Sequence, residues 1–160
     1  ELLALIFIIY VLCLFYVVTF QDVGWSSSNF IPFKEMFRYD FGSRLFIKNV
    51  LGNIIMFAPY GFFVSYYLHL KKPWSAFLLI LLVSASIETT QLLIGRVFDI
   101  DDIILNVIGG MIGFLIYKFL DLINDHLPEV LKNPIVYNII IVLCTVLMAM
   151  YMLNLIELGV

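Results

Sequence analysis

The sequence predicts an all-α protein, a polytopic bundle of four to five transmembrane helices with one short helix at the membrane surface. Of its 160 residues, 63% are hydrophobic and only 13% are charged. The mean hydropathy is +1.06, which lies well outside the usual range of soluble domains. The apolar residues form continuous runs rather than alternating patterns, and lipid requires backbone groups to be bonded within such a run. We therefore expect a single membrane domain, residues 1–160.

Five apolar runs are candidate spanning helices. The first, residues 2–20, carries no charge and lacks both the basic segment and the small-residue cleavage site of a signal peptide, so we expect it to be retained. Each of the others is about 20 residues long, which is enough to cross the hydrocarbon layer. They are expected at 46–68, 75–95 and 103–123, with an additional C-terminal helix at 136–156.

Two connections contain possible structure of their own. Residues 33–41, "FKEMFRYDF", place apolar side chains at helical spacing with charged residues between them. This pattern favours a short helix in the headgroup region. Residues 121–134 contain breaks at Pro128 and Pro134. We interpret this stretch as a plain connector, with a short turn of helix as the alternative.

Charge and cysteine content exclude several classes of function. The net charge is -3, and no block of basic residues occurs, so we expect no nucleic-acid partner. Cys13 and Cys144 each lie in an apolar stretch without a second ligand at metal-binding spacing. We interpret both as packing residues, and we predict no cofactor.

Polar residues inside three of the spans are expected to lie at similar depth in one leaflet. A rise of about 1.5 Å per residue puts Asn49 about 5 Å and Asn53 about 10 Å from the start of the second span. It puts Glu88 about 12 Å and Gln91 about 8 Å from the end of the third. Asn106 lies about 6 Å inside the fourth. Because all these ends are on the same side, the five residues are predicted to converge.

Glu88 is the most demanding residue of this group. An ionised carboxylate facing lipid costs about 2.5 to 3.5 kcal/mol on insertion scales, so the side chain should face the bundle interior or a wet cavity. Arg96 and Lys48 are the candidate partners for a charged Glu88. The alternative is a protonated, purely structural Glu88 that is hydrogen-bonded to one of three neighbours: Gln91, Asn53 or Ser84.

The following loop, "GRVFDIDD", is rich in acids. Asp101 or Asp102 occupies the position where a helix N-cap is expected, whereas Asp99 has no such structural explanation. Together with Arg96, the acids next to Glu88 suit either a divalent cation or a polar headgroup of mixed charge. The spacing is only weak support for a cation, and we predict no metal site.

Glycine and proline residues are predicted to shape the bundle. Gly109 and Gly113 form a G-x-x-x-G pattern in the fourth span, which lets a neighbouring helix approach closely. Gly52, Pro59 and Gly61 in the second span predict a kink or a locally opened helix.

Two blocks of the sequence resemble the VanZ-like membrane family, which is named for a teicoplanin-resistance protein of Gram-positive bacteria. They are "NVLGNIIMFAPYGF" at 49–62 and "SIETTQLLIGRVFDIDDIILNVIGGMIG" at 86–113. The resemblance covers residues 30–120, the VanZ-like core, and leaves the helix at 136–156 outside. The family pattern includes positions held here by Asn49, Asn53, Phe57, Pro59, Gly61, Glu88, Gln91, Arg96, Asp99, Asp102, Asn106 and Gly110.

The resemblance implies a role at the bacterial envelope in lowered susceptibility to glycopeptide or lipoglycopeptide antibiotics, with a multi-pass location in the cytoplasmic membrane. Three functions stay open. The favoured one is a non-enzymatic binder of an envelope lipid, a lipid-linked cell-wall precursor or a glycopeptide-related ligand. The second is a membrane-embedded hydrolase or transferase that uses Glu88 as acid or base, together with Arg96 and Asp99. The third is a scaffold or a transporter subunit.

The predicted ligand-binding residues are the polar members of the VanZ-like family pattern, and we expect them to surround one site. The set is Asn49, Asn53, Glu88, Gln91, Arg96, Asp99, Asp102 and Asn106. Basic residues flank both ends of the spans, so the positive-inside rule does not decide the orientation. We expect the site to face the outside of the cell, because the "LKKPW" turn at the other end carries Lys71 and Lys72 unopposed by acids.

Overall fold

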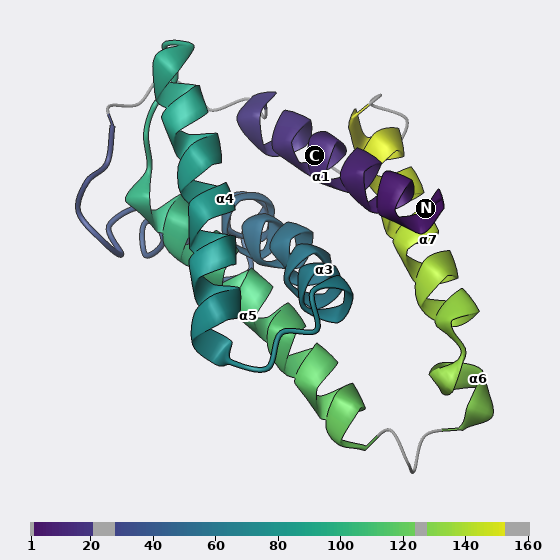
Figure 1. The fold of residues 1–160 in the computed structure, drawn as a ribbon. Helices are drawn as coiled ribbons and strands as arrows, with labels where there is room; N and C mark the ends of the chain where they lie inside the picture. The colour runs from purple at the N-terminus through teal and green to yellow at the C-terminus, as the bar shows by residue number, and fades with distance from the viewer. Residues whose placement is uncertain (1, 21–27, 124–127, 153–160) are drawn as a thin grey trace.

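The computed structural model describes residues 2–20, 28–123 and 128–152, and helices dominate this part of the chain (Figure 1). A parallel bridge also joins Asn29 to Asp99. The elements, in chain order, are α1 (Leu2–Phe20), α2 (Arg44–Phe46), the π-helical turn η1 (Ile47–Leu51), α3 (Gly52–Tyr67), α4 (Pro73–Leu93), α5 (Ile100–Leu122), α6 (Glu129–Lys132) and α7 (Pro134–Met152).

Three helical stretches of the described chain are long and apolar enough to cross a membrane. They are residues 44–67, which combine α2, η1 and α3, and the helices α4 and α5. Two further apolar helices, in α1 and α7, have shorter described stretches, Leu5–Tyr16 and Pro134–Leu147. The protein is therefore an all-helical membrane protein, and the count of four to five spans stays a prediction.

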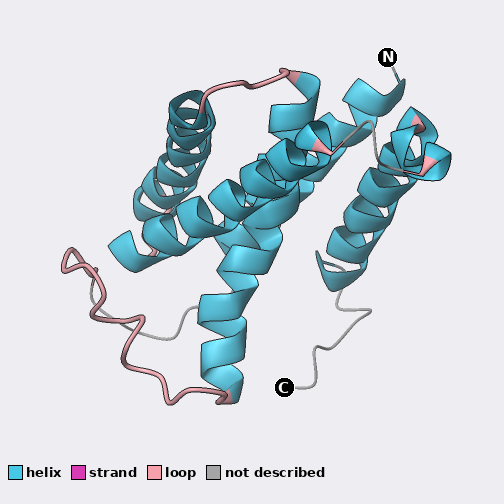
Figure 2. Ribbon diagram, turned by 90° about the horizontal axis from the view of Figure 1, so that it is seen from below, coloured by secondary structure: helices cyan, strands magenta, loops and turns pink. Residues whose placement is uncertain are grey.

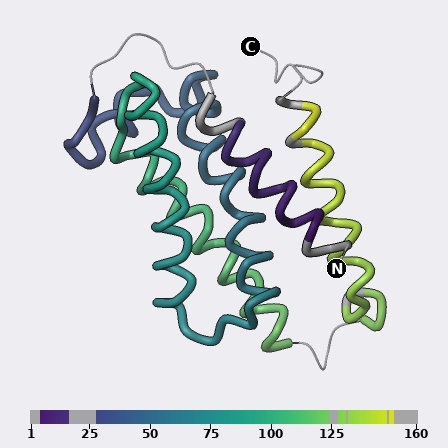
Figure 3. Tube along the Cα trace, turned by 45° about the horizontal axis from the view of Figure 1, so that its top comes forward, coloured from purple at the N-terminus to yellow at the C-terminus, as the bar shows by residue number. Residues whose placement is uncertain are grey.

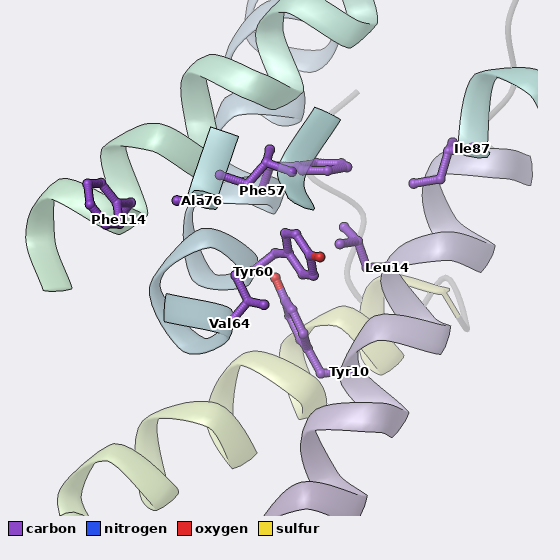
Figure 4. Packing of buried hydrophobic residues seen from close by; sticks show 9 residues of the cluster. Tyr10, Leu14, Phe57, Tyr60, Val64, Ala76, Ile87 and Phe114 are labelled. Atoms are coloured by element: carbon purple, nitrogen blue, oxygen red, sulfur yellow. The ribbon is translucent and has the colours of Figure 1, made fainter. Parts of the chain in front are cut away.

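The helices form two groups that meet at α1. In the first group α3 and α4 both pack against α5, and in the second α1 lies beside α7 (Figures 1 and 3). α1 also contacts α3 and α4. The hydrophobic core lies between these elements, and Figure 4 shows its packing from close by. It consists of the buried side chains of Tyr10, Leu14, Phe57, Tyr60, Val64, Ala76, Ile80, Ile87 and Phe114.

Glycines bring the backbones of α3 and α5 into direct contact. A Cβ atom added to Gly61 would overlap the backbone of Gly110, and one added to Gly113 would lie 2.6 Å from the backbone nitrogen of Phe62. At Gly109 an added Cβ would come 2.8 Å from the Cα of Ile54. No larger residue fits at such distances, so the packing role predicted for the glycines is confirmed.

The second span departs from regular α-helix just before Gly52. The turn η1 there is π-helical, a geometry that is rare and often occurs near functional sites. Pro59 lies inside α3, which continues through it from Gly52 to Tyr67. One turn before Pro59, the hydroxyl of Tyr10 donates a hydrogen bond of 2.8 Å to the carbonyl of Met56, and Figure 4 shows Tyr10 reaching toward Tyr60. The contact docks α1 onto α3.

The predicted surface helix at 33–41 is wrong. Residues 31–39 form successive turns, drawn as part of the long loop in Figure 2. The backbone of Phe33 has a φ of 68°, in the left-handed region that an L-residue avoids within a helix. In the connector at 121–134 the structure has the short helix α6, so the stretch is more than a plain connector, and residues 124–127 lie outside the described part.

Candidate functional site

Polar side chains are buried where the end of α4 meets the start of α5. Glu88 and Asn106 are 0% exposed, and Asp101 is 1% exposed. Asn53 on α3 and Gln91 on α4 are also buried. The helix periodicity explains this placement, because Ser84, Glu88 and Gln91 recur on one face of α4 and that face is turned toward α5.

Glu88 points into the bundle and is only half satisfied. Its Oε2 accepts a hydrogen bond of 2.9 Å from the backbone N–H of Asp99. Its Oε1 is buried and has no hydrogen-bond partner in the part of the chain that the structure describes. Arg96 lies close enough to attract the carboxylate electrostatically. The donor that the structure shows at Oε2 is thus a backbone N–H of the acidic loop, which the sequence did not predict.

Asn106 on α5 is also only half satisfied. Its Nδ2 donates a hydrogen bond of 3.0 Å to the hydroxyl of Ser84. Its Oδ1 is buried and, like the free oxygen of Glu88, lacks a partner among the described residues. Because Ser84 precedes Glu88 by four residues on α4, the two unbonded oxygens belong to the same region of the α4–α5 interface. Both are acceptors, so the group that completes this region must be a donor.

The N-cap of α5 is Asp99, and the prediction that Asp101 or Asp102 takes this position is wrong. The Asp99 side chain accepts a 2.9 Å hydrogen bond from the backbone N–H of Asp101. It also accepts one of 2.9 Å from the amide of Asn29. Burial raises the pKa of Asp99 above that of a free aspartate, and both hydrogen bonds oppose this shift. Asp99 therefore has the ordinary structural role that the sequence left unexplained.

The sequence did not predict that Asp101 connects the start of α5 to the backbone of residues 33–36. Its carboxylate accepts backbone hydrogen bonds of 2.5 Å from Phe33, 2.7 Å from Glu35 and 3.0 Å from Met36. Asn29 strengthens the connection, since its backbone N–H donates to Phe98 and its carbonyl accepts from Ile100. No local pattern predicts that Asp101 would bind residues 65 to 72 positions away. The only local signal is that an aspartate at the start of a helix is a common capping residue.

The remaining predicted residues take part in three separate contacts. Asn53 donates a 2.8 Å hydrogen bond to the half-buried Asp102, which joins α3 to α5. Asn49 is half-buried and lies close to Tyr39. Burial raises the pKa of the Tyr39 hydroxyl above its ordinary value, and the nearby amide of Asn49 opposes this shift. The backbone N–H of Arg96 donates to the carbonyl of Gln91 at 2.8 Å, which closes the C-terminal turn after α4.

Taken together, the structure brings Glu88, Arg96, Asp99 and Asn106 into one region of the α4–α5 interface, with the Asn53–Asp102 pair joining α3 to the start of α5. Asn49 marks the edge nearest to Tyr39 and the turns of 31–39. Among the described residues, no group of three or more Asp, Glu, His or Cys side chains has the arrangement of metal ligands. The chemistry available is hydrogen-bond acceptance by buried oxygens, with Arg96 as a nearby cation.

The family comparison covers this whole arrangement. A family model described as VanZ/LLP1 matches residues 7–121, which include most of α1 and nearly all of α5. Gly61 and Gly110, both positions of the resemblance, are among the residues at which the backbones of α3 and α5 approach closely. No curated protein and no solved structure matches the chain. Because the matched residues make up well over half of the sequence, the chain belongs to the VanZ/LLP1 family.

Proposed function

We propose that this protein binds the polar headgroup of an envelope lipid or a lipid-linked cell-wall precursor, without turnover, in the bacterial cytoplasmic membrane. In this proposal, binding lowers susceptibility to glycopeptide or lipoglycopeptide antibiotics. One observation supports it most: Glu88 is fully buried, and one of its carboxylate oxygens has no partner among the described residues. A buried polar atom left unbonded costs stability, which is typical of a site that serves function.

The chemistry of the region indicates which part of a headgroup each residue would meet. The free oxygens of Glu88 and Asn106 are acceptors, so they suit an amine or a hydroxyl. The guanidinium of Arg96 suits a phosphate, because its planar donors match two phosphate oxygens. A phosphate linked to an amine or a sugar carries both kinds of group, as many envelope headgroups do.

The alternative function is a hydrolase or transferase with Glu88 as acid or base. It would draw on Asp99 as a further acid, yet the Asp99 carboxylate already accepts hydrogen bonds from Asp101 and Asn29. A carboxylate engaged in capping a helix is poorly placed for proton transfer. This leaves Glu88 with Arg96, a smaller set than acid–base catalysis on a phosphate or glycosidic bond ordinarily uses, and it favours binding over catalysis.

The proposed function is tested with purified protein in nanodiscs and a radiolabelled lipid extract of a Gram-positive envelope. We expect saturable retention of one lipid class, which is recovered chemically unchanged after long incubation. Conversion of that lipid to a new product would establish the enzyme instead. Retention of no lipid class above the level of empty nanodiscs would contradict the proposal and favour a scaffold or transporter subunit.

We also propose that the site faces the outside of the cell. Asp40 is exposed near the site and Lys72 is exposed at the other end of the spans. In a variant without Cys13 and Cys144, a thiol introduced by Asp40→Cys should react with a membrane-impermeant reagent on intact cells. The thiol from Lys72→Cys should react only in permeabilised cells. The reverse pattern would place the site in the cytoplasm and exclude an extracellular headgroup.

A further inference from the structure

The loop of residues 29–41, called the strap below, presents a row of apolar side chains to its surroundings. The exposed fractions are 66% for Phe30, 63% for Ile31, 52% for Phe33, 79% for Phe37 and 92% for Phe41. Four aromatic rings exposed within twelve residues are unusual on a surface that faces water. An exposed apolar row of this kind indicates that lipid or an apolar protein surface covers it.

The exposed row continues into the side of a spanning helix. The ring of Phe41 lies 5.1 Å from the ring of Phe46, at the end of α2. From there, Leu45, Ile47 and Ile55 extend the exposed apolar surface along residues 44–67. That stretch is long and apolar enough to span a membrane, and its outer face is therefore covered by lipid. Since the ring contact between Phe41 and Phe46 joins the strap to this stretch, lipid is the occupant that fits it.

A loop can lie in an apolar layer only if its backbone donors are bonded. Asp101 supplies acceptors for the N–H groups of Phe33, Glu35 and Met36. Asn29 Oδ1 accepts from the N–H of Ile31 at 3.1 Å. Side-chain oxygens thus accept the backbone N–H groups of these turns, as main-chain carbonyls would in a helix. This makes a non-helical loop compatible with the membrane surface.

The charged residues of the strap set the depth to which it can enter. Lys34 and Arg38 are exposed between the aromatic residues, and Arg38 pairs with Glu35 at 3.0 Å. Basic side chains among aromatic ones are typical of the layer where headgroups meet acyl chains. An aqueous position would leave the rings in water, and a deeper one would bury the charges.

We propose that the strap is a lipid-contacting surface that inserts its aromatic face into the headgroup–acyl boundary of the bilayer, and that Asp101 is the positioning residue that ties it to α5. Asp101 lies two residues from Asp99, whose backbone N–H holds Glu88. The same short segment therefore joins the membrane-facing loop to the buried polar region. The proposal concerns the surface of the protein and stands whether or not the polar region binds a headgroup.

The test uses tryptophan fluorescence in phosphatidylcholine vesicles with and without brominated acyl chains. In a background where Trp25 and Trp74 are replaced by Phe, a Phe37→Trp or a Phe41→Trp variant carries one indole in the strap. Both native side chains are largely exposed, so folding should be unaffected. We expect strong quenching by the brominated lipid and weak quenching by aqueous iodide. Strong iodide quenching with no effect of bromine would place the strap in water and overturn the proposal.

The role of Asp101 is tested by adding Asp101→Asn to each of the two single-tryptophan variants. This change keeps the side-chain volume but removes the charge and one strong acceptor. We expect bromine quenching to fall at least about twofold and iodide quenching to rise, with helix content by circular dichroism unchanged. Unchanged bromine quenching in Asp101→Asn would refute the positioning role. Indoles shielded from both quenchers, with cross-linking between two copies, would assign the surface to a dimer and overturn the lipid assignment.

Discussion

Replacing Glu88 with Gln is expected to abolish any glycopeptide or lipoglycopeptide resistance that the protein confers, while leaving a folded protein in the membrane. The glutamine carbonyl can still accept the hydrogen bond from the backbone of Asp99, which is 2.9 Å in the native protein. The new NH₂ group replaces the free oxygen, so the site presents a neutral donor where a cationic or donor group of the ligand should bind. Losing one partner of a buried charged contact costs about 2 to 5 kcal/mol, and 1.4 kcal/mol is already a tenfold loss of affinity.

The measurement is growth inhibition by teicoplanin at matched expression of wild type and variant. Glu129→Gln is the matched control, because its carboxylate is 91% exposed and lies on α6, outside the polar region. It should retain full resistance. Full resistance in Glu88→Gln at normal expression would show that Glu88 is a neutral structural residue and would remove the main support for the proposed function.

Alanine at Gly113 or at Gly61 is expected to prevent the tight packing of α3 against α5. At both positions the added Cβ would meet the backbone of the facing helix, which cannot move aside as a side chain can. Overpacking in a core ordinarily costs about 1 to 3 kcal/mol, and a clash with the backbone of the facing helix should exceed this range. We expect a large fall in the melting temperature in detergent, with much of the protein aggregating on extraction.

Gly52→Ala provides the control within the same span. The nearest atom to a Cβ at this position is the carbonyl oxygen of Ile47 at 3.7 Å, an ordinary contact. Because alanine favours helix more than glycine does, this variant should be as stable as wild type or slightly more stable. Normal melting behaviour of Gly61→Ala and Gly113→Ala would mean that α3 and α5 are further apart than the structure places them.

The spanning helices could be predicted from the sequence because they depend on local information. Uninterrupted apolar length sets the boundaries to within a few residues, as in the expected 75–95 against the observed Pro73–Leu93. Helical rise alone also placed Glu88 and Asn106 at similar depth, and the structure buries both at the α4–α5 interface. The helix face follows from counting residues, and the tertiary fold did not override it here, whereas the depth in the membrane stays a prediction.

The hydrogen-bond partners could not be predicted, because they depend on contacts between distant segments. The apolar spacing of residues 33–41 fits a short helix, but Asp101 binds the backbone N–H groups there and fixes a sequence of turns. The cap of α5 shifted to Asp99 for a related reason, since Asn29 from the other segment donates to its carboxylate. Asn29 itself carries no local signal beyond being a polar residue after the first span.

Lipid analysis of protein extracted with its surrounding membrane tests most directly whether the buried polar region holds a headgroup. Wild type, Glu88→Gln and Glu129→Gln would be purified in native nanodiscs, and the retained lipids would be compared by mass spectrometry with those of the bulk membrane. The account predicts that one class of envelope lipid or lipid-linked precursor is enriched with wild type and Glu129→Gln, and that this enrichment falls at least about tenfold with Glu88→Gln. Identical lipids in all three preparations, each matching the bulk membrane, would contradict it.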